Sequence, residues 1–425
     1  MQCRNSSFCL FDQQAVQTDV IGSQIVDYHP RTAENAGPIE FVIPGSSDEY
    51  IDLSYANLDV KFKILQADGK AIGDNHKVGL NNVPLATLFR DVSLSIDDQQ
   101  VEGGQQDYPY KAYFNTVTQF HPSAQSSHMQ AVGWYKDQAG KFDDETNTGF
   151  VQRSKLIKES KVCQLYGPLH LDFFNQSRYL LANTTMRLKL TLNKPEFLLN
   201  AFGVATTFKI HLEDITLYIR RVTANPSVLQ GHNSGMTSQN AIYPIQHTKL
   251  VTFTIPKGQK SFMKDGLFPS QAPKLLLVAM VDNEAFNGHI KKNPFHFKHN
   301  DLSEIALRVN GVSHPGPSYK PDFSTSLYVR SYVDFMTVFG YSNKDDTNGL
   351  TMREFANGYT IYAFDLTADS DISAPYRQAN VPHNIRLDLE FKTTLVETIN
   401  VLIYGVFDSS VEITKLRDVI LHYNR

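Results

Sequence analysis

The chain has 425 residues, with 40 Lys and Arg against 44 Asp and Glu, so its formal net charge is −4. This near balance excludes a strongly basic nucleic-acid-binding protein and a strongly acidic, solvating tail. Charged residues make up only 20% and aromatic residues 11%, a composition that supports a large core in two or three domains. The aromatic load, with 24 Gly and 19 Pro, favours β-structure with many turns.

The cysteine content and the hydropathy exclude further classes of protein. The three cysteines, Cys3, Cys9 and Cys163, are too few for a disulfide scaffold and form no Cys-x-x-Cys zinc motif. The N-terminus lacks the charged-then-apolar order of a signal peptide. The longest apolar run, Leu275–Val281, is far shorter than the ~20 residues of a spanning helix. We therefore expect a reducing compartment, or one where disulfides do not matter, and no membrane span.

The first half begins with an arm, residues 1–37, that is rich in Gln, Ser and Asp and shows no sustained period. Short β-type runs follow, and alternation is clean where Leu58, Val60, Phe62 and Ile64 face one way and charged residues the other. We predict strands near 39–43, 51–55, 58–65, 90–97, 163–173, 184–193 and 207–221.

After a turn-rich stretch, the second half again consists of short β-type runs. Its strands are predicted near 247–255, 273–281, 302–312, 358–366, 382–393, 398–407 and 409–413. The two helical patterns lie at 109–121 and 325–339, where aromatic residues recur at helical spacing. We expect each aromatic stripe to pack on the sheets of its own half.

Four stretches of the first half recur in the same order in the second. The pairs are Phe41–Pro44 with Phe253–Pro256, Asp91–Ile96 with Glu304–Val309, Lys111–Asn115 with Arg330–Asp334, and Met186–Leu190 with Ile385–Leu389. The shared order predicts one β-domain unit used twice, each with about seven detectable strands and one helix. A jelly roll has ~8 strands, so we predict an all-β chain of two tandem jelly-roll sandwiches, each with a short helix in an inter-strand insertion.

The predicted organisation is an N-terminal arm (1–37), a first jelly roll (38–226), a linker (227–240) and a second jelly roll (241–425). A long insertion, 122–162, and a shorter loop, 341–357, leave the two halves at equivalent points, after the helix. We expect them to project together on one face.

Motifs for enzymatic chemistry are missing from the sequence. There is no phosphate loop, no dinucleotide-binding glycine motif and no His-Glu-x-x-His. Gly231–Gly235 is a near miss for a nucleophile elbow, with its serine one place too late. Acidic pairs at Asp97–Asp98, Asp143–Glu145 and Asp345–Asp346 lie in predicted turns, where we expect them to be solvated.

The densest histidine cluster, His289, His296 and His299, is interleaved with Lys291, Lys292 and Lys298. These lysines would repel a cation, so the segment is interpreted as a structural loop rather than a metal site. A flat aromatic platform for sugars is poorly supported, because Trp134 is the single tryptophan. No catalytic, cofactor-binding or metal-ligating residue is therefore predicted.

Several long stretches carry a family resemblance that spans about Pro38 to Ile413. They are Pro38–Leu53, Tyr108–Tyr113, Gly167–Leu181, Val281–Gly288, Asn293–His299, Asn357–Thr367 and Glu397–Tyr404. The chain resembles the double jelly-roll major capsid proteins of Polinton/Maverick elements and of adintovirus-like double-stranded DNA viruses. The family has Asn at the position of His296, which further argues against a metal ligand there.

The resemblance implies a structural protein that forms homotrimeric, pseudo-hexagonal capsomers of an icosahedral capsid, located in the virion and assembled inside the host cell. It implies the chain itself as main partner, a penton or minor capsid protein as a second partner, and no sequence-specific nucleic-acid binding. The alternatives from other classes are a double jelly-roll enzyme and a carbohydrate-binding protein.

Overall fold

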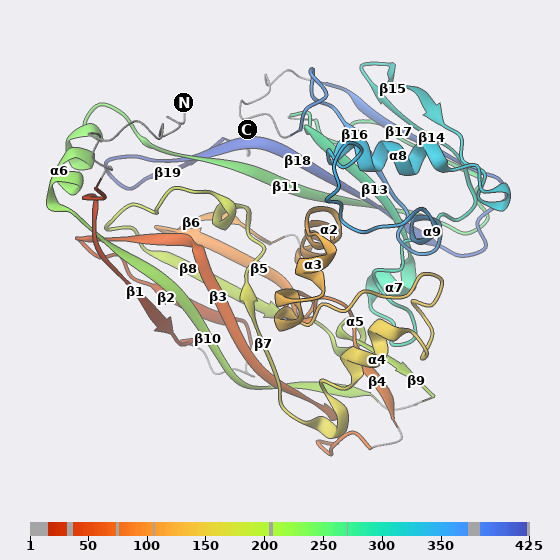
Figure 1. Cartoon of the computed structure of the whole chain (residues 1–425), viewed down its shortest axis with the longest axis horizontal. Coiled ribbons are helices and arrows are strands. Elements are labelled where there is room, and N and C mark those ends of the chain that lie inside the picture. The colour runs from red at the N-terminus through yellow and green to blue at the C-terminus, as the bar shows by residue number, and fades with distance from the viewer. Residues whose placement is uncertain are drawn as a thin grey trace, which may run out of the picture.

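The computed structural model describes residues 16–31, 37–73, 76–104, 107–203, 207–269, 271–372 and 383–422. Two β-sandwiches lie beside each other, the first below and the second above in Figure 1, with helices between them. The predicted fold class, two β-sandwiches in tandem, is confirmed.

The first sandwich has two four-stranded sheets and a short additional pair, β4 (Lys77–Leu80) with β9 (Leu199–Phe202). Sheet 1 has the order β1 (Val20–Tyr28), β10 (Phe208–Ala224), β3 (Glu49–Gln66), β7 (Cys163–Pro168). Sheet 2 has the order β2 (Ile39–Ile43), β8 (Met186–Leu192), β5 (Phe89–Ile96), β6 (Gln99–Glu102).

The second sandwich repeats this arrangement. Sheet 3 has the order β11 (Ala241–Ile255), β18 (Ile399–Ile413), β13 (Leu275–Asp282), β16 (Ile361–Asp365), and β19 (Val419–Leu421) also pairs with β18. Sheet 4 has the order β12 (Ser261–Lys264), β17 (Ile385–Phe391), β14 (Leu302–Val309), β15 (Val312–Tyr319). Counted by rank in each half, without β4 and β9, both halves have the orders 1-8-3-6 and 2-7-4-5. Two facing sheets with these orders, eight strands in all, make a jelly roll.

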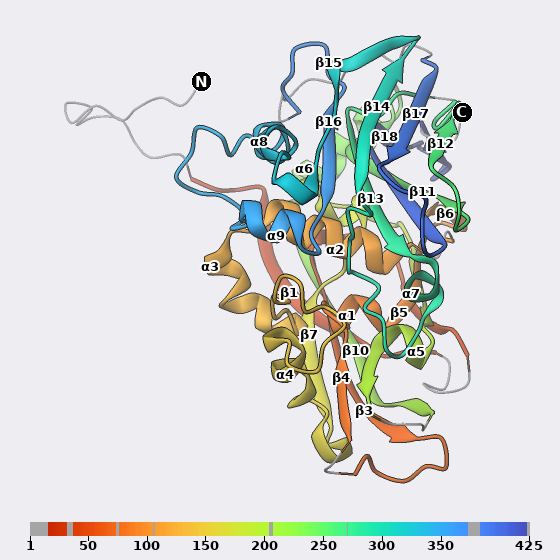
Figure 2. The ribbon, with the colours of Figure 1, turned by 90° about the vertical axis from the view of Figure 1, so that its right-hand side faces the viewer.

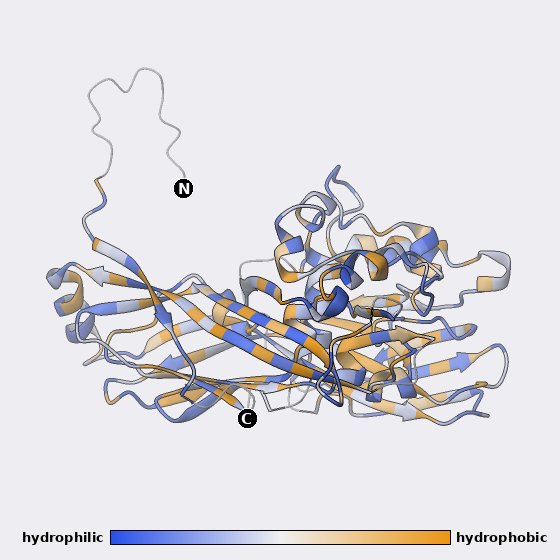
Figure 3. Ribbon diagram, turned by 90° about the horizontal axis from the view of Figure 1, so that it is seen from below, coloured by the Kyte–Doolittle hydropathy of each residue, from blue (hydrophilic) through white to orange (hydrophobic). Residues whose placement is uncertain are grey.

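Alternating hydropathy builds these sheets. Leu58, Val60 and Phe62 of β3 are 0% exposed, while Asp59 and Lys61 between them point outward. Figure 3 shows the same banding along the strands of both sandwiches. Burying one such apolar side chain stabilises the fold by about 1.5–3 kcal/mol.

Both predicted helices are present, as α2 (Tyr108–Gln119) and α8 (Val329–Val338), each following the fifth strand of its jelly roll. The other helices are shorter than α2. They are α1 (Pro84–Thr87), α3 (Pro122–Gln125), η1 (His128–Val132), α4 (Thr148–Ser154), η2 (Lys158–Ser160), η3 (Asp172–Asn175), α5 (Pro195–Leu198), α6 (Pro226–Gly235), α7 (Asn283–Asn287), η4 (Phe323–Thr325) and α9 (Met352–Ala356).

The prediction of an irregular arm over 1–37 is wrong for residues 20–28, which form β1. This strand is the first of its jelly roll and pairs with β10 from Val20↔Ala224 to Tyr28↔Leu217. Most of its side chains are exposed. Backbone hydrogen bonds, and not burial, hold it in place, so hydrophobic periodicity gave no signal.

The predicted linker 227–240 contains most of helix α6. Asn225 caps the helix by accepting a hydrogen bond from the Ser227 N–H at 3.1 Å, and Pro226 occupies its first turn. None of its residues is buried. A helix with no buried stripe shows no amphipathic period, which is why the segment read as a turn-rich linker.

Three of the four recurring pairs join strands or helices of equal rank: β5 with β14, α2 with α8, and β8 with β17. The pairing of Phe41–Pro44 with Phe253–Pro256 is wrong, because it joins the second strand of one half to the first strand of the other. Two alternating strands that both end in Ile-Pro look alike whatever their rank.

Two predicted strand pairs are single strands. Predicted 51–55 and 58–65 are both β3, whose register with β10 shifts between Ala56 and Asp52, so a bulge broke the alternation. Predicted 398–407 and 409–413 are both β18, where the polar Ser409 and Ser410 are nonetheless buried. The strands β4, β6, β9, β12, β15 and β19 were not predicted.

Candidate functional site

The central strand β13 of sheet 3 is buried on both faces. All eight of its residues are buried, and the seven from Leu275 to Val281 point alternately into two different cores. Val278 and Met280 face the core between sheets 3 and 4, whereas Leu277 and Ala279 belong to the core that includes the first sandwich. This double burial explains why Leu275–Val281 is an uninterrupted apolar run and makes the junction between sandwiches a large apolar interface.

Helix α2 lies in this junction, and 10 of its 12 residues are buried. Tyr113 stacks on Phe295 with ring centroids 4.1 Å apart, and Phe114 stacks on Phe297 at 5.4 Å. The ring centroids of Tyr404 of β18 and Phe114 lie 5.3 Å apart. The expectation that this aromatic stripe packs only on its own half is therefore wrong, because it also binds the second sandwich.

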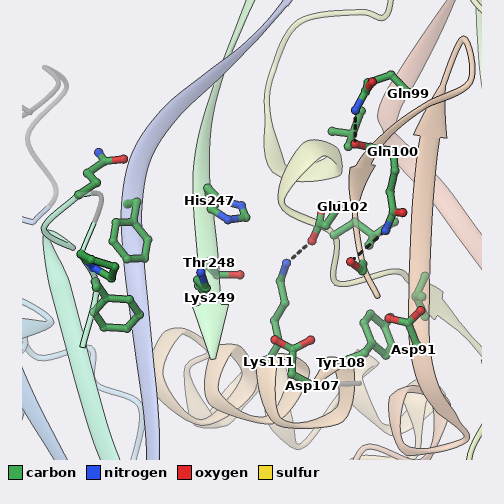
Figure 4. A pocket seen from close by; sticks show the side chains of 18 residues that line it. Asp91, Gln99, Gln100, Glu102, Asp107, Tyr108, Lys111, His247, Thr248 and Lys249 are labelled. Atoms are coloured by element: carbon green, nitrogen blue, oxygen red, sulfur yellow. Dashed lines mark hydrogen bonds and ion pairs between the residues drawn. The ribbon is translucent and has the colours of Figure 1, made fainter. Parts of the chain in front are cut away.

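A buried group of charges lies beside α2, and we call Lys111, Glu102, Asp172, His247 and Thr248 the junction cluster. Figure 4 shows Lys111, Glu102, His247 and Thr248 of this cluster. The Lys111 ammonium contacts Asp172 Oδ1 at 2.7 Å and also pairs with Glu102. Asp172 accepts the backbone N–H of Thr248 at 2.7 Å, and His247 Nδ1 lies 3.5 Å from it. The cluster thus ties α2, β6 and η3 of the first half to β11 of the second.

The charges of the cluster control one another's pKa. Burial alone would lower the pKa of the Lys111 ammonium, but the carboxylates of Asp172 and Glu102 outweigh it and raise that pKa. Burial raises the pKa of Glu102, and the Asp172 charge adds to the rise. The pKa of Asp172 is lowered, since Lys111 and His247 together outweigh its burial. Burial and the Lys111 charge lower the pKa of nearby His170 to about 4.

Lys111, Glu102, His247 and Thr248 line a cavity of about 330 Å³ at the edge of the junction. A lysine with a raised pKa stays protonated and is a poor base or nucleophile. Both oxygens of Asp172 accept hydrogen bonds from the second sandwich or Lys111. The arrangement is therefore suited to holding the two sandwiches together.

The histidines of the basic segment do not converge. His296 Nδ1 lies 2.7 Å from Asp143 Oδ2 and its ring stacks on Phe142. His299 stacks on Phe323 at 4.0 Å, and the His289 ring accepts a hydrogen bond from the Lys291 N–H. Within the described ranges, no three His, Cys, Asp or Glu side chains are grouped as metal ligands.

The acidic pairs serve local contacts. Asp98 pairs with Arg187, Glu145 with Lys77, and Asp346 lies 3.7 Å from His121. Asp97 and Asp143 depart from the expectation of solvation. Asp97 is partly buried, accepts the Thr185 N–H at 2.8 Å, and has a raised pKa from that burial. Asp143 is also partly buried, accepts the Asn293 N–H at 2.6 Å and contacts His296.

Three further candidates for functional residues lie at structural positions. Gly231–Gly235 lies in α6 rather than at a strand-to-helix turn. Trp134 is 2% exposed and packs near Tyr113, so it anchors its loop and offers no sugar platform. Cys163 is a free, buried thiol whose pKa is raised by burial to about 11; Cys3 and Cys9 lie outside the described residues.

The insertion 122–162 and the loop 341–357 lie together, as predicted. Lys136 donates to the Gly349 carbonyl at 2.8 Å and pairs with Glu354 at 2.8 Å, and the Gly140 N–H donates to the Asn357 carbonyl. Figure 2 shows α3, α4, α8 and α9 on one side of the sandwiches.

The junction cluster itself was missed in the sequence. Its members come from segments up to about 150 residues apart, and no spacing rule joins them. One signal was available: Lys111 stands among aromatic residues of a helical stripe, and a lysine there needs a buried partner. In the part of the chain that the structure describes, no helix is long and apolar enough to cross a membrane.

Comparison with known proteins gives one curated relative and several structural ones. No protein-family model matches the chain. Uncharacterized protein F54H12.2 of Caenorhabditis elegans is 25% identical over 400 residues, a match that covers 91% of this chain and 93% of the relative.

Solved viral structures match the chain from end to end. A chain of the Sputnik virophage has a TM-score of 0.65 and 14% identity, covering 100% of this chain and 92% of its own. The fold is a double jelly roll. The mavirus major capsid protein (TM-score 0.57, 12% identity, 99% and 94% covered) and the Faustovirus major capsid protein (0.59, 8%, 94% and 92%) share it.

Proposed function

We propose that this protein is the major capsid protein of an icosahedral virus or virus-like element with a double-stranded DNA genome. Three copies form a pseudo-hexagonal capsomer, and capsomers tile the shell. The chain acts as a structural subunit and not as an enzyme, and its place is the virion.

The observation that carries the proposal is the repeated strand order of two sandwiches joined rigidly through α2, in a chain that viral capsid proteins match over its whole length. Three copies of two similar sandwiches supply six similar units, the number that a hexagonal tile needs. The rigid junction keeps the angle between the sandwiches fixed, as a tile requires.

Surface chemistry supports lattice assembly. The formal net charge is −4 with both signs represented, which suits many weak lateral contacts rather than one strong field. A closed shell multiplies such contacts through avidity. The modest charge also agrees with genome contacts that are local or left to other proteins.

The finer assignment, to the Polinton/Maverick and adintovirus lineage, rests on the sequence stretches between Pro38 and Tyr404. The proposed boundaries of the first and second jelly rolls are 38–226 and 241–425, with β1 added to the first from within the arm. A penton or minor capsid protein is the expected second partner. The buried Trp134 weakens the carbohydrate-binding alternative.

Electron microscopy of the purified full-length protein, with light scattering for its mass in solution, tests the proposal. We expect a trimer that forms hexagonal sheets or shells at high concentration. A stable monomer that forms no ordered assembly under any condition of salt and concentration would contradict it, and a hydrolase activity in that monomer would favour an enzyme.

A further inference from the structure

The outer faces of sheet 1 and sheet 3 are equivalent in the two jelly rolls, but only that of sheet 3 is covered. The face of sheet 3 that points away from its own core is covered by the first sandwich, and Tyr404 of the eighth strand is 2% exposed there. The equivalent face of sheet 1 remains open. On it Tyr166 is 37% exposed, and Tyr218, on the eighth strand of its jelly roll, lies 6.1 Å from Tyr166.

Helix α8 is the counterpart of α2 in the second half. The recurrence of Lys111–Asn115 as Arg330–Asp334 has an offset of 219, and the same offset pairs Tyr110 with Val329 and Phe114 with Val333. Tyr110, Tyr113 and Phe114 of α2 all pack against the second sandwich. Tyr332, the counterpart of Tyr113, is partly buried against Phe355. Tyr110 and Phe114 are 3% and 0% exposed.

The corresponding residues of α8 have no such cover. Val329 is 49% exposed and Val333 is 44% exposed, and Leu327 just before the helix is 67% exposed. The opposite face of α8 is packed, with Ser331 and Phe335 buried, and the stripe of Val329 and Val333 ends at Met336, which is also buried. Over its first turns, one face of α8 is thus apolar and exposed, and it is in the position of a face that is an interface in the first half.

We infer that a second copy of this chain covers both surfaces: the Val329–Val333 face of α8 in one copy docks on the open face of sheet 1 in the next. The inference rests on the proposed function, since it names the contact that closes the capsomer. The internal junction supplies the pattern, in which the helix after the fifth strand covers the outer face of the following sandwich. Repeated head to tail, such a contact closes into a ring.

The composition of the open face fits a contact between proteins that fold before they assemble. Tyr55, Tyr166 and Tyr218 lie on it, and the Arg220 guanidinium lies 5.8 Å from the centre of the Tyr55 ring. Tyrosine and arginine are the residue types enriched at the centres of such interfaces. Ion pairs surround them, including Lys61 with Asp214 at 2.8 Å, as in a polar rim.

Two surface variants test the contact from its two sides. Val333→Asp places a charge on α8, and Tyr218→Asp places one on sheet 1. Each is expected to reduce the mass measured by light scattering threefold, from trimer to monomer, while its circular dichroism spectrum stays that of the wild type and shows that the subunit is folded. Val396→Asp is the matched control, because Val396 is 88% exposed in the turn between β17 and β18, and it should remain trimeric.

Mixing the variants tests the head-to-tail arrangement. Val333→Asp retains an intact sheet 1 face and Tyr218→Asp an intact α8 face, so an equimolar mixture should contain heterodimers of twice the subunit mass. If both single variants remain trimeric, or if the Val396→Asp control dissociates as much as they do, the inference is overturned while the proposed function stands. A monomeric wild type overturns the proposed function itself.

Discussion

Lys111 is the residue on which the junction depends most at the level of single charges. Its side chain is 7% exposed and contacts Glu102 and Asp172, whose side chains are 10% and 4% exposed. Removing one partner from a buried group of charges leaves the others uncompensated in a medium of low polarity. The junction is thus held both by aromatic packing and by buried charges.

Lys111→Met should destabilise the protein by about 3–5 kcal/mol, because two buried carboxylates lose their shared cation. Urea denaturation followed by the fluorescence of Trp134, the single tryptophan, reports on this region because its ring lies 5.9 Å from Tyr113 of α2. Lys70→Met removes an exposed ion pair with Asp68 and should leave the urea midpoint nearly unchanged, because water screens exposed charges. Equal urea midpoints for the two variants would show that the cluster contributes no more to stability than an exposed ion pair.

Acid should loosen the junction through His170. Its folded-state pKa of about 4 lies below the usual 6.5, so the unfolded chain takes up the proton first, and stability is lost as the pH falls from 6.5 toward 4. Between pH 6.5 and 5 the loss is on the order of 2 kcal/mol. The lowered pKa of Asp172 acts in the same direction, but only at lower pH.

The measurement is the urea midpoint at pH 7 and at pH 5 for the wild type and for His170→Gln. The wild type should lose stability over this interval, and the variant, which has no group to protonate at that position, should lose clearly less. Identical slopes for both proteins would exclude His170 as the source.

At the scale of elements, β1 is a strand held by its backbone. It pairs along β10 while Ile21 and Ile25 remain 66% and 54% exposed. Without it, β10 would present an unpaired edge with long alternating strands behind it, which is a template for aggregation. The strand therefore protects the first sandwich more than it adds to its core.

Replacing residues 20–28 with a Gly–Ser segment of equal length should expose the β10 edge and cause aggregation. Hydrogen exchange of the β10 amides between Leu217 and Ala224 should accelerate at the same time. Ile25→Ser serves as the control, since it keeps the backbone pairing, and it should leave exchange and solubility unchanged. Unchanged exchange in the Gly–Ser variant would show that β1 is dispensable.

Sequence patterns predicted elements where side chains carried the signal. Alternation located β3, β5 and β8, and aromatic spacing located α2 and α8 within a few residues. Elements held by backbone bonds or caps, such as β1 and α6, gave no pattern. The junction cluster was out of reach for another reason: Glu102, Asp172 and His247 meet only because the two sandwiches fold against each other.

For the whole molecule, the repeated strand order and the asymmetric cover of sheets 1 and 3 point to the same architecture. One sandwich already covers the outer face of the other within the chain, through a helix that recurs in the second half with its apolar face exposed. In the proposed ring of three chains, one kind of contact covers the exposed surfaces of both halves.

The most direct test is a cryo-electron microscopy reconstruction of the oligomer purified from recombinant full-length protein. We predict a threefold-symmetric ring of six sandwiches, with α8 of each copy against sheet 1 of the next. A monomer, or a twofold dimer that leaves sheet 1 open, would contradict the account.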